Sequence, residues 1–156
     1  SDGLLDTRIV AIDPAPRASI DGLNITVESA TIHEVDALYF ELLKPGDILF
    51  IDSSHIMMPG TDVDFLFNQI FGQLKAGVII HIHDIFLPDD YPQSWEWRGY
   101  NEQLGVAALL QGQGFDVLFA SNYVAKHMRE ALQGTLIAEL DRPKGIYETS
   151  LWLKKC

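Results

Sequence analysis

Two almost unbroken runs of aliphatic residues, at 47–52 and 78–82, constrain the fold of this chain more than any other feature. Such runs are typical of strands in a parallel sheet, because helices cover both faces of that kind of sheet. The segment between the runs carries apolar residues at helical spacing over 63–74, after a capping Thr61 and before Gly77. Strand, helix and strand follow one another, which indicates a parallel α/β sheet with right-handed crossovers.

Further strands and helices are expected on either side of this unit. The strands are predicted over residues 8–13, 23–28, 116–120 and 147–153. Helices are predicted over 101–111, over 124–132 and from Thr31, where Glu34 completes a capping box. Residues 87–99 form a long loop rich in Pro and Trp. Loops of this length in compact domains often act as lids.

Length and composition favour a single domain spanning residues 1–156, because 47% apolar residues suffice for one core. The 22 acidic and 11 basic residues give a net charge of −11, and so acidic a surface repels nucleic acid. No apolar run approaches the ~18 residues that cross a bilayer. The one cysteine, Cys156, excludes an intrachain disulfide, and residues 1–6 contain no signal peptide. We therefore expect a cytoplasmic protein without nucleic-acid or membrane partners.

Acidic and histidine side chains follow three of the predicted strands. Ligands bind at the carboxyl ends of the strands in an open parallel sheet, so these side chains are expected at one edge. They are Asp13, Asp52, His55, His81, His83 and Asp84. Each also has a purely structural interpretation: Asp13 precedes a proline and could form a turn, Asp52 could start a loop or cap a helix, and His55 could be a structural histidine. His81 is expected to pack beneath the site.

A divalent cation could bind within this group. Asp52, His83 and Asp84 are the candidate ligands. Carboxylates suit Mg²⁺, whereas an imidazole favours Mn²⁺, Fe²⁺ or Zn²⁺, and the sequence leaves the choice open.

The two strand regions, LKPGDILFIDSSH at 43–55 and LKAGVIIHIHDIF at 74–86, resemble class I S-adenosylmethionine-dependent methyltransferases. Within that class the chain is most similar to the methyltransferase 24 family. The later Tyr91-Pro92, Trp95 and Asn101-Glu102-Gln103 also fit the lid and following helix of that family. The resemblance is specific over residues 44–123 and looser over 7–28.

The resemblance implies a Rossmann-like three-layer sandwich with a mostly parallel sheet and an antiparallel final strand. The six expected strands correspond to strands two to seven of the family's seven, so the central first strand is missing. The family's acid-Gly-x-Gly loop after that strand has no counterpart, since Gly112-Gln113-Gly114 ends a helix. We therefore expect the chain to be the carboxyl-terminal portion of such an enzyme, truncated at its N-terminus and inactive alone.

The same resemblance assigns roles to individual residues. It implies that Asp13 and Ser29 border the ribose and adenine of S-adenosyl-L-methionine, with Asp52 at the donor as well. It places Mg²⁺ or another divalent cation at Asp52, His83 and Asp84, although many relatives carry a carboxylate or amide where this chain has His83. His55 matches the base of sugar methyltransferases by its spacing from Asp52.

Chemical requirements agree with an O-methyltransferase that acts on a small-molecule hydroxyl of the sugar or phenol type. Positioning supplies much of the rate of an in-line methyl transfer, and an imidazole with a pKa near ~6.5 can accept the hydroxyl proton. Trp95, Trp97 and Tyr100 could stack on an acceptor ring while Arg98 pairs with a carboxylate or phosphate. Equally, this lid could pack on its own core.

Two other classes of function remain open from the sequence. One is a metal-dependent hydrolase or oxygenase built on His55, His81, His83 and Asp84. The other is a non-catalytic assembly module whose exposed sheet pairs with another chain, which would produce a homo-oligomer.

Overall fold

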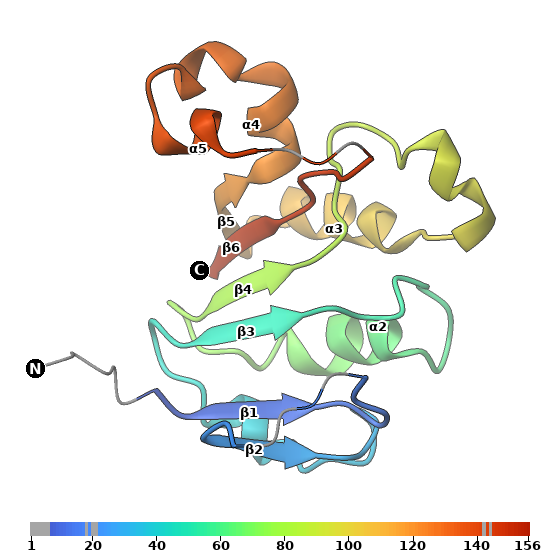
Figure 1. The fold of residues 1–156 in the computed structure, drawn as a ribbon. Helices are drawn as coiled ribbons and strands as arrows, with labels where there is room; N and C mark the ends of the chain where they lie inside the picture. The colour runs from blue at the N-terminus through green and yellow to red at the C-terminus, as the bar shows by residue number, and fades with distance from the viewer. Residues whose placement is uncertain (1–6, 18, 20–21, 142, 144) are drawn as a thin grey trace, which may run out of the picture. The chain divides into compact units, whose positions relative to one another are not determined.

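The computed structural model describes residues 7–17, 19, 22–141, 143 and 145–156 of a mixed α/β chain (Figure 1). The chain divides into two compact units, Ser1–Tyr39 and Phe40–Cys156. Residues 1–6, on which the prediction of no signal peptide rests, lie outside the described residues. Over the described ranges, no helix combines the length and apolar character that a membrane span requires.

The first unit contains a two-stranded parallel sheet. Its strands are β1 (Ile9–Ile12) and β2 (Ile25–Glu28), with Ile9 opposite Ile25 and Ile12 opposite Glu28. β-Branched residues dominate both strands, and such side chains pack well on a pleated surface. The backbone NH of Asp13 donates to the carbonyl of Glu28 at 3.1 Å, so pairing continues one residue beyond β1.

The helix predicted from Thr31 is wrong. Glu34 does accept hydrogen bonds from the backbone NH and the hydroxyl of Thr31, at 2.9 and 2.8 Å, as in a capping box. These bonds close only one turn, and helix α1 (Leu38–Glu41) begins later. The carboxylate of Asp36 accepts from the NH of Leu38 at 2.9 Å. A short acidic side chain that bonds a nearby backbone NH competes with continuation of a helix, which explains the interruption.

A four-stranded mixed sheet forms the second unit, in the order β3-β4-β6-β5. Its strands are β3 (Ile48–Ile51), β4 (Ile79–Ile82), β5 (Phe115–Ala120) and β6 (Leu151–Lys155). Strands β3 and β4 are parallel, and β6 runs antiparallel to β4 and β5. The prediction of an antiparallel final strand is confirmed, but that strand begins at Leu151 rather than at 147. Thr149 instead bonds the loop after β4, where its carbonyl accepts from the NH of Ile85.

Helical segments follow β3, β4 and β5 in this unit. They are α2 (Asp62–Phe65), η1 (Leu66–Ile70), η2 (Gln93–Arg98), α3 (Glu102–Gln111), α4 (Ser121–His127), η3 (Arg129–Leu132) and α5 (Leu136–Glu139). Thr61 caps α2 as predicted, and α3 lies where the sequence indicates. The predicted helix at 63–74 changes from an α to a π pattern, because the NH of Phe71 donates to the carbonyl of Leu66. The helix predicted over 124–132 is instead α4 and η3, separated at Met128.

Helices α2 and α3 lie on the same face of the four-stranded sheet (Figure 1). The buried side chains that join them to the sheet come from both layers. They are Ile51, Val63, Leu66, Ile70, Ile80, Ile82, Val106, Leu151 and Leu153. This apolar layer fixes the ends of β3 and β4, which carry the candidate site.

Strand β3 is covered on only one face, so the expectation of cover on both faces is wrong for this strand. Ile51 is buried beside the helices, but Ile48 and Phe50 are 54% and 62% exposed. The reason is position, since β3 lies at the edge of its sheet. Phe50 stacks on His81 with ring centroids 4.3 Å apart, and His81 meets Trp152 edge-on at 4.6 Å.

Candidate active site

His55 lies in the loop after β3 and is buried. Its φ of 59° falls in the left-handed region, which non-glycine residues adopt rarely and most often at functional sites. The start of α3 holds this backbone in place. The NH groups of Asn101 and Glu102 donate to the His55 carbonyl at 3.0 and 3.2 Å, and the Asn101 side chain accepts from the NH of Met57 at 2.6 Å.

Glu102 fixes the orientation of the imidazole. Its Oε2 accepts a hydrogen bond from Nδ1 of His55 at 2.9 Å and a second from the hydroxyl of Ser53 at 2.8 Å. The Glu102 side chain is almost fully buried, so these partners satisfy a carboxylate removed from water. With its hydrogen on Nδ1, the neutral imidazole has Nε2 free to accept a proton.

Nε2 of His55 faces two carboxylates from neighbouring strand ends. Asp52 Oδ1 lies 3.4 Å from it, and Asp84 Oδ2 lies 3.7 Å from it. The predicted convergence of Asp52, His55 and Asp84 at one edge of the sheet is therefore found. Burial of the ring opposes its protonation, but the hydrogen bond and charge of Glu102, with the charges of Asp84 and Asp52, raise the pKa of His55 above its ordinary value.

Asp84 connects the histidines to the lid. It too has a left-handed backbone, with φ of 56°, and its side chain is buried. Oδ1 accepts from the Thr149 hydroxyl at 3.1 Å and lies 3.3 Å from Nε2 of His83. Oδ2 lies 3.9 Å from the guanidinium of Arg98 in η2. The Asp84 carboxylate thus contacts both His83, which follows β4, and Arg98 of η2.

Tyr100, directly after the 87–99 loop, packs on His55. The ring of Tyr100 lies 4.5 Å from the His55 ring. The Arg98 guanidinium lies 4.0 Å from the centre of the Trp95 ring and donates to the Tyr100 hydroxyl at 3.3 Å. Trp97, in contrast, is 82% exposed. Trp95 and Arg98 are held by the protein, and Trp97 is the predicted acceptor-binding residue that is open to solvent.

The predicted donor residues Asp13 and Ser29 belong to the other unit, and both are exposed. Asp13 Oδ1 accepts from the NH of Ala15 at 2.8 Å. This is the turn that the structural interpretation of Asp13 predicts. The positions of these two residues neither support nor contradict a contact with the ribose or adenine.

The metal prediction finds no ready-made ligand set. Among the described residues, no group of three or more His, Cys, Asp and Glu side chains is arranged to hold a metal ion. Nε2 of His55 lies 3.4 Å from Asp52 and 3.7 Å from Asp84, the two carboxylates expected to share a cation. His83 contacts Asp84 but is partly exposed. His81 packs beneath the site as expected, and its buried Nδ1 has no hydrogen-bond partner among the described residues.

One residue of this cluster escaped the sequence analysis as a functional group. Glu102 contacts His55, yet an acid in the first turn of a helix is ordinary. Tyr100, which the sequence predicts to stack on an acceptor ring, packs against the His55 ring. A usable signal was the predicted start of α3, because it places Glu102 on a helix that packs against the sheet. Comparisons with known proteins give no match among family models, curated proteins or solved structures.

Proposed function

We propose that this chain is the acceptor-side portion of an S-adenosylmethionine-dependent O-methyltransferase, with His55 as the general base for a small-molecule hydroxyl. The observation that carries the proposal is the dyad of His55 and Glu102, in which Nδ1 is bonded and Nε2 faces the carboxylates of Asp52 and Asp84. A buried imidazole backed by a carboxylate is the usual arrangement for removing a proton at neutral pH.

The arrangement of strands supports the Rossmann-like part of the proposal. In the proposed seven-stranded fold, β1 and β2 are strands two and three, and β3 to β6 are strands four to seven. The family's central first strand has no counterpart among the six. The strands fall into two separate sheets, and only the final strand is antiparallel to its neighbours.

Donor binding is only partly provided by the residues of this chain. Asp13, Ser29 and Asp52 are the proposed contacts, and Asp13 and Ser29 have exposed side chains. No strand in the described residues is followed by an acid-Gly-x-Gly loop. When bound, the donor supplies a methyl group on a positively charged sulfur. We expect this chain alone to bind it weakly.

The residues around His55 suffice to derive how the acceptor hydroxyl would lose its proton. The hydroxyl proton passes to Nε2 of His55, and the resulting imidazolium is stabilised by Glu102 through Nδ1. Asp52 and Asp84 add negative charge beside Nε2, which favours the protonated ring further. Tyr100 and Arg98 in the lid restrict access of water to this side of the imidazole. No step requires a metal ion, and a cation at Asp52, His83 and Asp84 remains a separate prediction.

The test is transfer of radiolabelled methyl to a panel of sugar and phenol hydroxyls. It compares this chain with whatever product its reading frame encodes when translated from upstream of Ser1. We expect transfer only from a product with a Gly-x-Gly loop after a strand, and a loss of at least about 100-fold on His55→Asn. His127→Asn, a change at an exposed histidine outside the cluster, is the matched control.

Two results would contradict the proposal. Full transfer by the His55→Asn variant would remove His55 as the base. An upstream sequence without a Gly-x-Gly loop, together with no donor binding by either product, would reject the methyltransferase itself. Micromolar binding of the donor to this chain alone would overturn the narrower expectation that its donor site is incomplete.

A further inference from the structure

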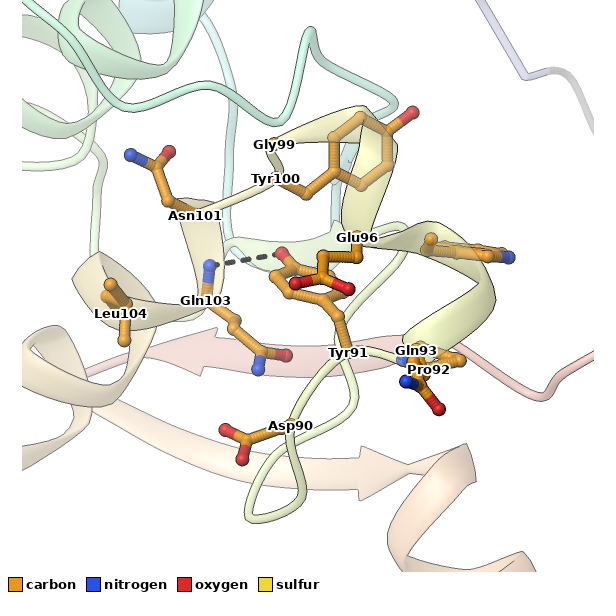
Figure 2. A pocket seen from close by; sticks show the side chains of 11 residues that line it. Asp90, Tyr91, Pro92, Gln93, Glu96, Gly99, Tyr100, Asn101, Gln103 and Leu104 are labelled. Atoms are coloured by element: carbon orange, nitrogen blue, oxygen red, sulfur yellow. Dashed lines mark hydrogen bonds between the residues drawn. The ribbon is translucent and has the colours of Figure 1, made fainter.

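A pocket of about 530 Å³ lies beside the lid, between η2 and the start of α3 (Figure 2). Three aromatic residues contribute to its lining: Tyr91, Trp95 and Tyr100. The pocket is separate from the His55 cluster, because His55, Asp52 and Asp84 do not line it. Tyr100 is the residue common to both, since its ring also contacts the His55 ring.

The aromatic rings meet nearly at right angles. Tyr91 and Tyr100 have centroids 5.9 Å apart and planes 73° apart, and Trp95 and Tyr100 have centroids 6.0 Å apart and planes 84° apart. Such rings form walls that present both faces and edges to a ligand. The face of an aromatic ring attracts a cation, and quaternary ammonium groups are bound by sets of rings of this kind.

The rings are held firmly. Trp95 packs edge-on against Phe86 at 5.2 Å, and Tyr91 does so at 5.6 Å. The Tyr91 hydroxyl accepts from the NH of Gln103 at 3.3 Å (Figure 2). Burial raises the pKa of Tyr91 to about 12, so its ring is uncharged at neutral pH. The walls are therefore largely formed before a ligand binds.

The charged groups of the lining are all acidic. Asp90 and Glu96 contribute carboxylates, with Asp90 at the opposite end of the pocket from Tyr100 (Figure 2). No Lys or Arg lines this pocket in the part of the chain that the structure describes. Arg98 does not line the pocket; its guanidinium lies 4.0 Å from the centre of the Trp95 ring and 5.3 Å from that of the Tyr100 ring, and the Asp84 carboxylate faces it at 3.9 Å. An organic cation would find both aromatic faces and negative charge here.

We propose that this pocket binds a small organic cation that carries a substituted ammonium group. The proposal does not rest on methyl transfer, because binding at the pocket needs neither the donor nor His55. Its failure is thus distinguishable from failure of the proposed function. The ammonium group lies among Tyr91, Trp95 and Tyr100, with Asp90 and Glu96 supplying the counter-charge.

Choline is the probe, and 3,3-dimethyl-1-butanol is its neutral control because it has the same shape without the charge. Binding is followed by the shift of the Trp95 indole NH in nuclear magnetic resonance spectra of the whole chain. We expect a saturable shift with choline and at least about tenfold weaker binding of the neutral control. Glu96→Gln and Asp90→Asn each weaken choline binding by about two- to fivefold. Glu139→Gln, at an exposed acid outside the pocket, leaves it unchanged.

Each of three outcomes overturns the proposal. The first is the absence of a saturable shift with choline. The second is equal affinity for choline and its neutral control, which would make the pocket a merely apolar site. The third is wild-type affinity in the Glu96→Gln, Asp90→Asn double variant. Both substitutions are at exposed positions, so loss of folding does not obscure the result.

Discussion

Glu102 and His55 are 47 positions apart in the sequence, and their side chains meet in a hydrogen bond of 2.9 Å. The contact joins the first residue of α3 to the loop after β3. It sets the tautomer of the imidazole and adds a negative charge at one end of the ring. The basicity of His55 therefore depends on how α3 packs against the sheet.

Replacing Glu102 by Gln is expected to lower the pKa of His55. An amide still accepts a hydrogen bond but removes the charge that favours the imidazolium. The measurement is a titration of the His55 Cε1 proton by nuclear magnetic resonance in wild type and variant, with Glu139→Gln as control. An unchanged His55 titration in a folded Glu102→Gln variant would show that Glu102 does not tune this base.

The free energy of unfolding is expected to peak near pH 6.5 in the neutral range. The pKa of His55 is raised in the folded state, so its contribution is present below the unfolded value of about 6.5 and is lost as pH rises through the folded pKa. Burial and the neighbouring His83 lower the pKa of His81, so its contribution is present above about 6.5 and is lost as pH falls. Urea unfolding across pH measures both slopes.

The Glu102→Gln variant provides the internal comparison for this pH profile. It should flatten the decline on the alkaline side, because His55 loses its main charged partner. The acid side should keep its slope, since His81 does not contact Glu102. If the Glu102→Gln profile differs from the wild-type profile only on the acid side, groups other than His55 cause the alkaline decline in the free energy of unfolding.

Gly105 on α3 is expected to resist substitution by Ala. A Cβ at this position would stand 2.5 Å from Sδ of Met57, in the loop that carries His55. The Met57 side chain must move aside and Phe67 Cε1 stands 3.1 Å away, so we expect a net loss of about 1 kcal/mol in the free energy of unfolding, after the gain of about 1 kcal/mol that Ala ordinarily brings over Gly in a helix. Gly112→Ala is the matched control, because its Cβ would meet only the Leu109 carbonyl oxygen, at 3.4 Å.

A double variant tests the cause of this effect. Met57→Ala removes the obstructing sulfur, so Gly105→Ala should cost less in that background than in the wild type. The two losses should therefore be non-additive by about 0.5 kcal/mol or more. Additive losses would mean that the clash with Met57 is not what opposes the alanine.

Asp84→Asn is expected to loosen the lid. Asn tolerates the left-handed backbone of this position but cannot supply the charge that faces Arg98. Backbone amides of η2 should exchange with solvent faster, as measured by hydrogen exchange and mass spectrometry. Asp90→Asn, near the lid but without the Arg98 contact, should leave exchange in η2 unaltered.

Binding of a cation by Asp52, His83 and Asp84 is expected to perturb His55, because Nε2 of His55 lies 3.4 and 3.7 Å from the carboxylates of Asp52 and Asp84. Titration of the chain with Mg²⁺ should therefore shift the His55 and His83 resonances together and stoichiometrically, and Asp52→Asn should abolish the shift. Unchanged His55 and His83 resonances at saturating Mg²⁺ would contradict the predicted cation site.

Local sequence signals predicted the parts of this molecule that depend on local interactions. Thr61 does cap α2, but the helix that Gly77 is predicted to end stops at Ile70, and Gly77, with φ of 89°, lies in the turn before β4. The meeting of Asp52 with His55 and Asp84 followed from strand ends sharing one edge of a sheet. These inferences needed only periodicity, capping and topology.

The missed features depend on contacts between distant segments. Nothing near Glu102 in the sequence marks it as the partner of a residue 47 positions earlier. Similarly, the capping box at Thr31 forms as expected, but the competing bond from Leu38 to Asp36 ends the helix after one turn. The hydrogen bond between Asp36 and Leu38 therefore outweighs the capping box of Thr31 and Glu34.

The edge position of β3 has a consequence for how this chain behaves at high concentration. Ile48 and Phe50 point outward from a strand whose second side has no pairing strand in the four-stranded sheet. Such an edge is a template for strand-to-strand association between copies. The net charge of −11 opposes that association by mutual repulsion at neutral pH. Acidification toward the isoelectric point of about 4.6 removes the repulsion, so light scattering should rise steeply near that pH. Added salt screens the repulsion at neutral pH and should lower the protein concentration at which scattering begins to rise.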